Sequence, residues 1–355
     1  MIAPFIGWRY VSFLMFISKF RCKTLPTIYL HIGFNKTGTT SIQKYFYDNK
    51  NVLFKNGILY PDVGLINSAH YGISTSVGFY NNPVRNGWSF DLKRLRKSLC
   101  NQITEDIHSI ILSSEDFILD RDFKSLRYFL KGFPTKIIVY LRRHDYWWMS
   151  AYAQAVKMKV NPPWGLGIQS YINFNKKNNI SYGNYRYLVE RWASEFGEEN
   201  IIVRPYENLQ NSPNIAFDFL SCVSELKDLD DFPIMAINKN VSLPSRAIQF
   251  LDIIQRMDVD VSVREKLIWH VCNATYFDYQ NLSLLSGKIR YSIVDENMAD
   301  YDFLARKYLK RESGLFYDVM PDPDDNDVQR WPSNMEFGEV LIKAMNSDVN
   351  FSFNV

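Results

Sequence analysis

The sequence predicts an α/β protein of three layers, in which a central parallel β-sheet lies between helices and a helical C-terminal portion follows. Two observations support this fold class. Short apolar runs rich in β-branched residues alternate with helical patterns from residue 27 to about residue 209, as in parallel strands joined by helices. Beyond residue 209 the patterns are mostly helical. We expect strands at Thr27–Ile32, Ser109–Ser113, Lys136–Leu141 and Asn200–Arg204.

The length and composition favour one large domain. The chain has 355 residues, of which 46% are apolar, and this is enough for a sizeable core. No Gly/Ser-rich linker separates the strand-rich part from the helical part. We therefore expect an apolar extension over residues 1–26, one domain over residues 27–317, and a tail over residues 318–355 that packs on the domain or trails from it.

The first predicted strand ends in a loop of small residues, 33–41, that turns into a helix. Such a loop directs several backbone N–H groups at one point, where the positive end of the helix dipole adds its field. Lys36 supplies a full positive charge, and the hydroxyls of Thr37, Thr39 and Thr40 are candidate partners for anion oxygens. The sequence therefore predicts a site for a phosphate-like anion.

The position of the lysine separates this loop from a nucleoside-triphosphate P-loop. A P-loop reads G-x-x-x-x-G-K-[ST], with the lysine directly after the second glycine. Gly33 and Gly38 have this separation, but Thr39 follows Gly38 and the lysine is Lys36. We also find no apolar strand that ends in a convincing Mg²⁺-binding aspartate, which transfer from ATP or GTP requires. A nucleotide-dependent P-loop kinase is therefore the less favoured alternative.

The string K-T-G-T-T-S, from Lys36 to Ser41, resembles the 5′-phosphosulfate loop of sulfotransferases that use 3′-phosphoadenosine 5′-phosphosulfate (PAPS). The longer string from His31 to Gln43 is similar to the bacterial branch related to carbohydrate sulfotransferases. The resemblance implies that PAPS is the sulfuryl donor, that no metal takes part, and that Lys36 is catalytic. The residues that it implies for cofactor binding are Lys36, Thr37, Gly38, Thr39, Thr40 and Ser41.

A second element fits the same family. The predicted strand Lys136–Leu141 is followed directly by Arg142, and Ser150 comes eight residues later in a helical pattern. In sulfotransferases the strand that carries the 3′-phosphate site ends in an arginine, with a serine at this spacing. A guanidinium offers a planar fork to phosphate oxygens, and a hydroxyl adds one donor. The resemblance therefore implies that Arg142 and Ser150 bind the 3′-phosphate of PAPS.

Two later stretches extend the resemblance over residues 27–317. Residues 206–209 read Y-E-N-L directly after a predicted strand, as after a core strand of many sulfotransferases. Residues 296–316 resemble the C-terminal helix of the bacterial branch. We interpret both stretches as scaffold and assign them no chemistry.

The acceptor hydroxyl needs a general base, and the sequence leaves two candidates. Glu115 follows the strand Ser109–Ser113, where other members of the family carry a histidine or a glutamate base. His70 matches a histidine-containing position of the bacterial branch, and a histidine titrates near neutrality. Glu115 is the first candidate. We expect His31 to pack beneath the loop and His144 to face solvent.

The acceptor itself is predicted only as a class. Trp147, Trp148, Tyr152 and Trp164 follow the strand of the 3′-phosphate site, and aromatic faces suit stacking on sugar rings. Because aromatics at helical spacing are more often core, we expect one or two of them to line a pocket. The resemblance implies a glycan or another hydroxyl-bearing acceptor. A non-catalytic nucleotide-binding protein of the same fold is a third interpretation, disfavoured because a complete set of candidate residues is present.

Charge and cysteine content restrict the remaining classes. The net charge is +3 and no basic cluster is interleaved with aromatics, so nucleic-acid binding is not expected. The four cysteines are widely scattered, which fits reduced thiols in the cytoplasm. Residues 1–20 are apolar but interrupted by charges, so they are candidates for peripheral membrane contact and not for a span of about twenty residues. The acidic run 322–327 lacks the ligand order of an EF-hand, and we expect no metal there.

Overall fold

A computed structural model describes residues 25–80, 87, 89–223, 232–233, 243–274, 277 and 282–346. These residues fall into two compact units, and each is considered by itself. Unit 1 takes in Met1–Leu141 and Tyr187–Met235, and unit 2 takes in Arg142–Arg186 and Ala236–Val355. The domain boundaries predicted after residues 26 and 317 are not tested by this division and stay predictions.

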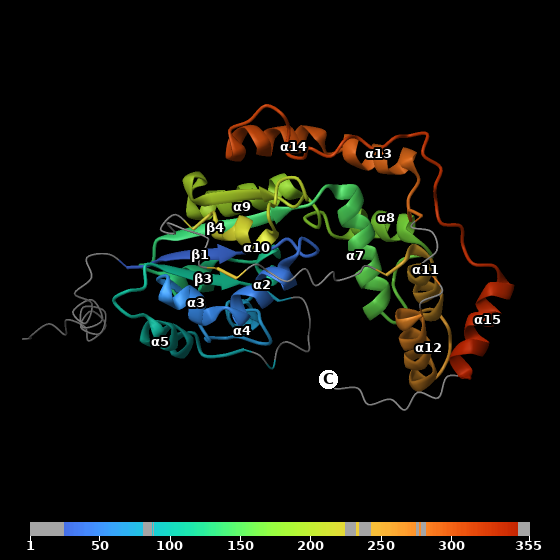
Figure 1. The fold of residues 1–355 in the computed structure, drawn as a ribbon, viewed down its shortest axis with the longest axis horizontal. Helices are drawn as coiled ribbons and strands as arrows, with labels where there is room; N and C mark the ends of the chain where they lie inside the picture. The colour runs from blue at the N-terminus through green and yellow to red at the C-terminus, as the bar shows by residue number, and fades with distance from the viewer. Residues whose placement is uncertain are drawn as a thin grey trace, which may run out of the picture. The chain divides into compact units, whose positions relative to one another are not determined.

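Unit 1 contains a five-stranded sheet in the order β2-β3-β1-β4-β5, and all neighbouring strands are parallel (Figure 1). This confirms the predicted α/β fold with a central parallel sheet. All four predicted strands are present, with ends that differ by at most one residue. The sequence did not reveal β2, because two residues are too few to show a pattern. The strands are β1 (Thr27–His31), β2 (Ile58–Leu59), β3 (Ser109–Ser113), β4 (Thr135–Leu141) and β5 (Ile201–Pro205).

Both faces of this sheet are buried. One face packs with helices α2 (Thr39–Asp48), α3 (Lys50–Lys55) and α10 (Ile215–Leu220) in a single apolar cluster. Successive side chains of a strand point to opposite faces, and residues of both faces, such as Tyr29 and Leu30, are almost inaccessible to solvent. The other helical elements that lie wholly or mostly in unit 1 are α4 (Tyr71–Ser76), α5 (Leu92–Gln102), η2 (Glu115–Ile118), α6 (Lys124–Leu130), α9 (Tyr185–Phe196) and η3 (Glu198–Asn200).

Unit 2 is helical over its described residues, as the sequence predicts for the C-terminal portion (Figure 1). Helix α7 packs against α8, α11 and α13, and α12 packs against α11 and α15. Part of the chain after residue 318 lies on α11. Gln249 of that helix donates to the carbonyl of Gln329 at 2.9 Å. The elements of unit 2 are α7 (His144–Met158), α8 (Ile168–Asn178), α11 (Ser245–Ile254), α12 (Val261–Asn273), α13 (Gly287–Asp295), α14 (Met298–Leu304), the π-helix η5 (Ala305–Leu309) and α15 (Asn334–Met345).

The sheet register brings the ends of β1 and β3 together. His31 aligns with Ser113 across the parallel pair, and the N–H of Ser114 donates to the carbonyl of His31 at 3.1 Å. On the other side of β1, the N–H of Phe34 donates to the carbonyl of Tyr140 at 2.9 Å. The segments that follow β1 and β3 therefore leave the sheet at its carboxyl edge, where ligands bind in open α/β sheets.

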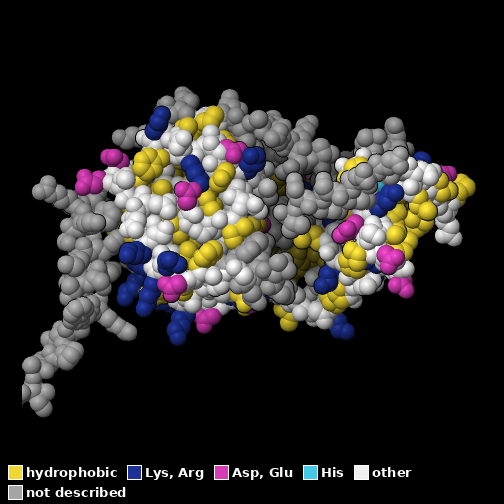
Figure 2. Space-filling view, turned by 90° about the horizontal axis from the view of Figure 1, so that it is seen from below, with side chains coloured by type: hydrophobic (Ala, Val, Ile, Leu, Met, Phe, Trp, Pro, Cys, Tyr) yellow, Lys and Arg dark blue, Asp and Glu magenta, His cyan; other side chains and the backbone are white. Residues whose placement is uncertain are grey.

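The surface is mixed in character. On the face that Figure 2 shows, acidic, basic and apolar side chains are all present, and Lys and Arg side chains gather at its lower left. No helix within the described ranges combines the length and the apolar character that crossing a bilayer requires. The predicted membrane contact through residues 1–20 lies outside the described residues.

Candidate functional site

The loop between β1 and α2 turns through three left-handed residues. Gly33, Lys36 and Gly38 have φ angles of 111°, 65° and 76°. The positive φ of Lys36 is uncommon for a residue with a side chain, and such conformations gather at ligand clamps and active sites. The lysine therefore lies in a turn that the surrounding fold holds in place.

The N-terminus of α2 has backbone donors to offer. Gly38 is the N-cap and supplies no side chain to the helix end. The N–H groups of Ser41 and Ile42 donate to the carbonyl of Gly38 at 3.0 and 3.1 Å, whereas those of Thr39 and Thr40 meet no backbone acceptor among the described residues. Free helix-start N–H groups and the helix dipole are what an anion site requires, so this helix start is the candidate for the predicted site.

The hydroxyls of the loop differ in what they can do. Thr37 is fully buried, and its hydroxyl donates to the carbonyl of Phe34 at 2.6 Å. Because an anion only accepts, the predicted hydrogen bond from the Thr37 hydroxyl to an anion does not fit this geometry. The Thr39 side chain is buried, that of Thr40 is exposed, and that of Ser41 is half-buried. Thr40 and Ser41 thus remain the hydroxyls with access to a ligand.

Two glycines let other segments approach the loop closely. A Cβ added to Gly38 would lie 3.0 Å from the ring of Tyr206 and 3.1 Å from Ile215. A Cβ added to Gly33 would lie 3.5 Å from the Cα and Cβ of Glu115. Glu115, the first candidate for the base, therefore lies close to Gly33, at the start of the loop that carries Lys36.

Both carboxylate oxygens of Glu115 accept hydrogen bonds. The amide of Gln43 donates to Oε2 at 2.9 Å, and the hydroxyl of Tyr71 donates to Oε1. Glu115 is half-buried at the start of η2, where Ser114 caps the turn. These two donors fix the orientation of the carboxylate, and the remaining lone pairs can still accept a proton.

Gln43 connects Glu115 to the core beneath the loop. Its amide also donates to the hydroxyl of Ser113 at 3.2 Å, and that hydroxyl lies 2.8 Å from Nδ1 of His31. His31 is fully buried, as predicted, and burial lowers its pKa to about 3. Gln43 and Tyr71 had no predicted role. In the sequence, the one feature that marks Gln43 is that a polar residue directly follows Ile42. In the structure, both positions of α2 are buried.

His70, the second candidate for the base, is engaged on both sides of its ring. Its Nδ1 accepts from the N–H of Ser113 at 3.0 Å, so its Nε2 carries the proton and donates to the carbonyl of Pro61 at 3.0 Å. The side chain is fully buried, and burial lowers its pKa to about 4. This geometry leaves no lone pair for an acceptor proton and favours Glu115 over His70.

Arg142 and Ser150 both belong to unit 2. Arg142 directly follows β4, and its carbonyl accepts from the hydroxyl of Tyr185 at 2.7 Å. Its guanidinium lies 5.9 Å from the ring centroid of Tyr146. Ser150 is half-buried in the second turn of α7. The structure thus brings Glu115 together with the loop in unit 1, whereas the predicted 3′-phosphate residues are described with the helices of unit 2.

The prediction that His144 faces solvent is wrong. His144 is buried, its ring stacks on Tyr185 at 4.1 Å, and burial lowers its pKa to about 4. The apolar side chains around this helix start enclose it. The four aromatic residues that were candidates for stacking on a sugar acceptor also belong to the core. Trp147, Trp148 and Tyr152 are at most 2% exposed, and Trp164 is 8% exposed.

The described residues contain no group of three or more His, Cys, Asp or Glu side chains that could hold a metal ion. The molecule is an α/β protein whose first strand leads, through a loop that contains Lys36, into a helix start without a side-chain cap.

Comparison with known proteins gives two similarities. An uncharacterised protein of Archaeoglobus fulgidus is 30% identical over 168 residues, which are 46% of this chain and 42% of that protein. The matched stretch thus spans less than half of that relative. The crystal structure of a sulfotransferase from Alicyclobacillus acidocaldarius is similar with a TM-score of 0.42 and 17% identity, over 68% of this chain and 99% of that one. No family model matches the sequence.

Proposed function

We propose that this protein is a sulfotransferase that moves the sulfuryl group of PAPS to a hydroxyl acceptor by in-line displacement. The observation that carries the proposal is that Glu115 lies close to Gly33, at the start of the loop of Lys36. This supports the proposal because a lysine, a set of backbone donors and a carboxylate all follow strands at the carboxyl edge of one sheet. Sulfuryl transfer needs these three kinds of group, because its catalysis consists mainly of positioning and charge stabilisation.

The loop would hold the 5′-phosphosulfate. The N–H groups of Gly38, Thr39 and Thr40 would donate to the 5′-phosphate, with the hydroxyls of Thr40 and Ser41 assisting. Lys36 would offset the negative charge that grows on the leaving oxygen as its bond to sulfur breaks. Since this charge is largest in the transition state, the lysine would contribute more to turnover than to affinity.

Glu115 would act on the acceptor. The acceptor oxygen forms its bond to sulfur while the bond from sulfur to the 5′-phosphate oxygen breaks, and the hydroxyl proton passes to the carboxylate. Gln43 and Tyr71 support this assignment because they orient Glu115 through both of its oxygens. The product 3′-phosphoadenosine 5′-phosphate then leaves with the electron pair of the broken bond.

Arg142 and Ser150 would bind the 3′-phosphate and so distinguish PAPS from ATP. A charge-assisted pair between a guanidinium and a phosphate is among the stronger hydrogen bonds in proteins. The carbohydrate nature of the acceptor rests on the resemblance of the first loop to the branch related to carbohydrate sulfotransferases. The buried aromatic side chains add no support to it.

Ligand binding and transfer test the proposal together. Thermal denaturation with 3′-phosphoadenosine 5′-phosphate, with adenosine 5′-phosphate and with Mg²⁺–ATP should show the largest stabilisation for the bisphosphate, in proportion to RT ln(1 + [L]/Kd). Incubation with ³⁵S-labelled PAPS and a panel of glycans should then label one acceptor class. Stabilisation by Mg²⁺–ATP alone would indicate a kinase, and bisphosphate binding without transfer to any hydroxyl acceptor would indicate a binding protein.

A further inference from the structure

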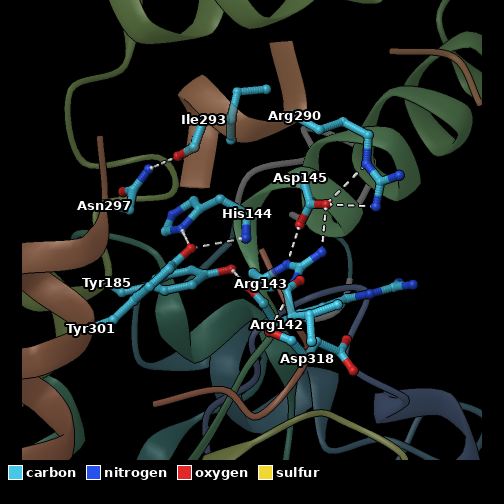
Figure 3. Close-up of polar contacts among 11 residues, drawn as sticks. Arg142, Arg143, His144, Asp145, Tyr185, Arg290, Ile293, Asn297, Tyr301 and Asp318 are labelled. Atoms are coloured by element: carbon cyan, nitrogen blue, oxygen red, sulfur yellow. Dashed lines mark hydrogen bonds and ion pairs between the residues drawn. The ribbon is translucent and has the colours of Figure 1, made fainter. Parts of the chain in front are cut away.

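The segment Arg142–Asp145, which begins unit 2, is held by side chains from distant parts of that unit (Figure 3). Asp145 is fully buried, and Arg143 is only 4% exposed. A buried ion pair contributes little net stability compared with apolar residues of similar size, because both charges lose their hydration. A buried ion pair between Arg143 and Asp145 at the start of α7 therefore points to a requirement for fixed geometry at this helix start.

The carboxylate of Asp145 joins two arginines. Arg143 binds it through both oxygens, with Nε at 2.8 Å from Oδ1 and Nη2 at 2.9 Å from Oδ2. Arg290 of α13 donates to Oδ2 from Nε at 3.1 Å and from Nη2 at 2.9 Å. Arg143 also donates through Nη1 to the carbonyls of Asp318 and Val319, at 3.2 and 2.6 Å. Two distant parts of the chain, α13 and residues 318–319, are thereby tied to the start of α7.

His144, between Arg143 and Asp145, is held by Tyr301 of α14. The backbone N–H of His144 donates to the hydroxyl of Tyr301 at 3.0 Å. Its Nε2 lies 2.6 Å from the carbonyl of Gly183, and a carbonyl only accepts, so Nε2 carries the proton. Its Nδ1 therefore accepts the Tyr301 hydroxyl proton, at 2.5 Å. Every polar atom of this ring is satisfied, and the first turn of α7 cannot rotate without breaking these bonds.

Arg142 is the member of the segment whose backbone carbonyl is held by a side chain. Its carbonyl is fixed by the hydroxyl of Tyr185, and its side chain passes over Tyr146, the ring that Arg143 and Arg290 also face at 4.7 and 5.1 Å. Figure 3 shows the Arg142 side chain directed away from Asp145. The backbone of Arg142 is thus held while its guanidinium lies outside the Asp145 ion pairs.

We infer that Tyr185 and Arg290 are positioning residues, which fix the backbone of Arg142 so that its guanidinium is set for one phosphate group. The inference rests on the proposed function, in which Arg142 binds the 3′-phosphate. Hydrogen bonds weaken steeply when their angle departs from linear, and an arginine that is ordered before binding loses less entropy on binding. The helices α13 and α14 would then affect nucleotide recognition without touching the nucleotide.

Tyr185→Phe tests the inference with a small change. It removes the hydroxyl bond to Arg142 and keeps the ring that stacks on His144. We expect binding of 3′-phosphoadenosine 5′-phosphate to weaken about fivefold, the scale of one hydrogen bond, with no change for adenosine 5′-phosphate. Tyr171→Phe is the matched control, because it removes a buried hydroxyl of the same unit that lies 3.3 Å from the hydroxyl of Tyr182. The control should leave the ratio of the two affinities unchanged, whatever it does to stability.

A double-mutant cycle shows whether Tyr185 acts through Arg142. In an Arg142→Ala background, Tyr185→Phe should weaken bisphosphate binding no further, since the group it positions is absent. Arg290→Gln should behave in the same way. Independent losses that add in the double variant, or an equal loss for both nucleotides, would overturn the inference.

The failure of this inference is distinguishable from the failure of the proposed function. If the wild-type protein shows no preference for the bisphosphate over adenosine 5′-phosphate, the proposed function fails and the inference fails with it. If the wild-type protein has that preference and Arg142→Ala removes it, but Tyr185→Phe and Arg290→Gln keep it, the inference alone is wrong.

Discussion

Gly38→Ala is the sharpest test of the anion loop, because the structure shows two separate costs. The glycine has a φ of 76°, and a left-handed conformation costs a residue with a Cβ about 1–2 kcal/mol. The new Cβ would also lie 3.0 Å from the ring of Tyr206 and 3.1 Å from Ile215, so those side chains must move by a few tenths of an ångström. We expect a total loss of about 2–3 kcal/mol in the free energy of unfolding, which a domain of ordinary stability tolerates.

The same change should disturb ligand binding more than stability alone explains. Gly38 directly precedes Thr39 and Thr40, whose N–H groups are the proposed phosphate donors. If the strain shifts them by a few tenths of an ångström, their hydrogen bonds to the anion become longer and less linear. We expect the affinity for 3′-phosphoadenosine 5′-phosphate to fall about tenfold or more, on the scale of losing one or two charge-assisted contacts. Isothermal titration calorimetry measures the affinity, and urea denaturation measures the stability.

Gly78→Ala is the matched control in the same unit. Gly78 has a φ of 94°, and an added Cβ would meet nothing within 4 Å. It should lose about 1–2 kcal/mol of stability, the cost of the left-handed conformation alone, and keep the affinity of the wild-type protein. If Gly38→Ala binds the bisphosphate as well as Gly78→Ala does, the loop is not the anion site.

Four further predictions concern the candidate site and the buried histidines. Arg142→Ala should weaken 3′-phosphoadenosine 5′-phosphate about tenfold or more and leave adenosine 5′-phosphate nearly unchanged, as measured by calorimetry; an equal loss for both would show that Arg142 does not bind the 3′-phosphate. Glu115→Gln should keep bisphosphate affinity and lower turnover about a hundredfold or more, whereas Lys36→Ala should lower turnover more than cofactor affinity; full activity of Lys36→Ala would refute sulfuryl transfer. His70 and His144 each have a pKa of about 4 in the folded protein against 6.5 when unfolded. The folded state therefore binds fewer protons, and its stability is complete above pH 6.5 and falls as the pH approaches 4. The pKa of buried His31 is lowered in the same way, to about 3. Urea denaturation should therefore show a loss of about 2 kcal/mol for each of these three histidines between pH 7.5 and pH 5, and a flat profile over this range would show that none of the rings is buried in its neutral form.

The sequence alone was enough to predict the sheet and the loop of small residues that joins its first strand to a helix. Both follow from local chemistry: apolar β-branched runs form buried strands, and a loop with Gly33, Gly38 and Lys36 before a helix exposes backbone donors. These features depend on neighbours within a few residues, so their pattern is visible without coordinates. Even the expectation that His31 lies beneath the loop could be drawn from its place at the end of an apolar strand.

The tertiary structure decided which polar residues act together. The sequence leaves both Glu115, the first candidate, and His70 as possible bases, and only packing shows that backbone groups engage both nitrogens of the His70 ring while Glu115 lies close to Gly33 of the loop. Gln43 lies 72 positions from Glu115 in the chain and still donates to it. His144 was wrongly expected in solvent because the rings that bury it, Tyr185 and Tyr301, lie far from it in the sequence. Contacts between residues far apart in the chain depend on the whole fold, and no local pattern in the sequence records them.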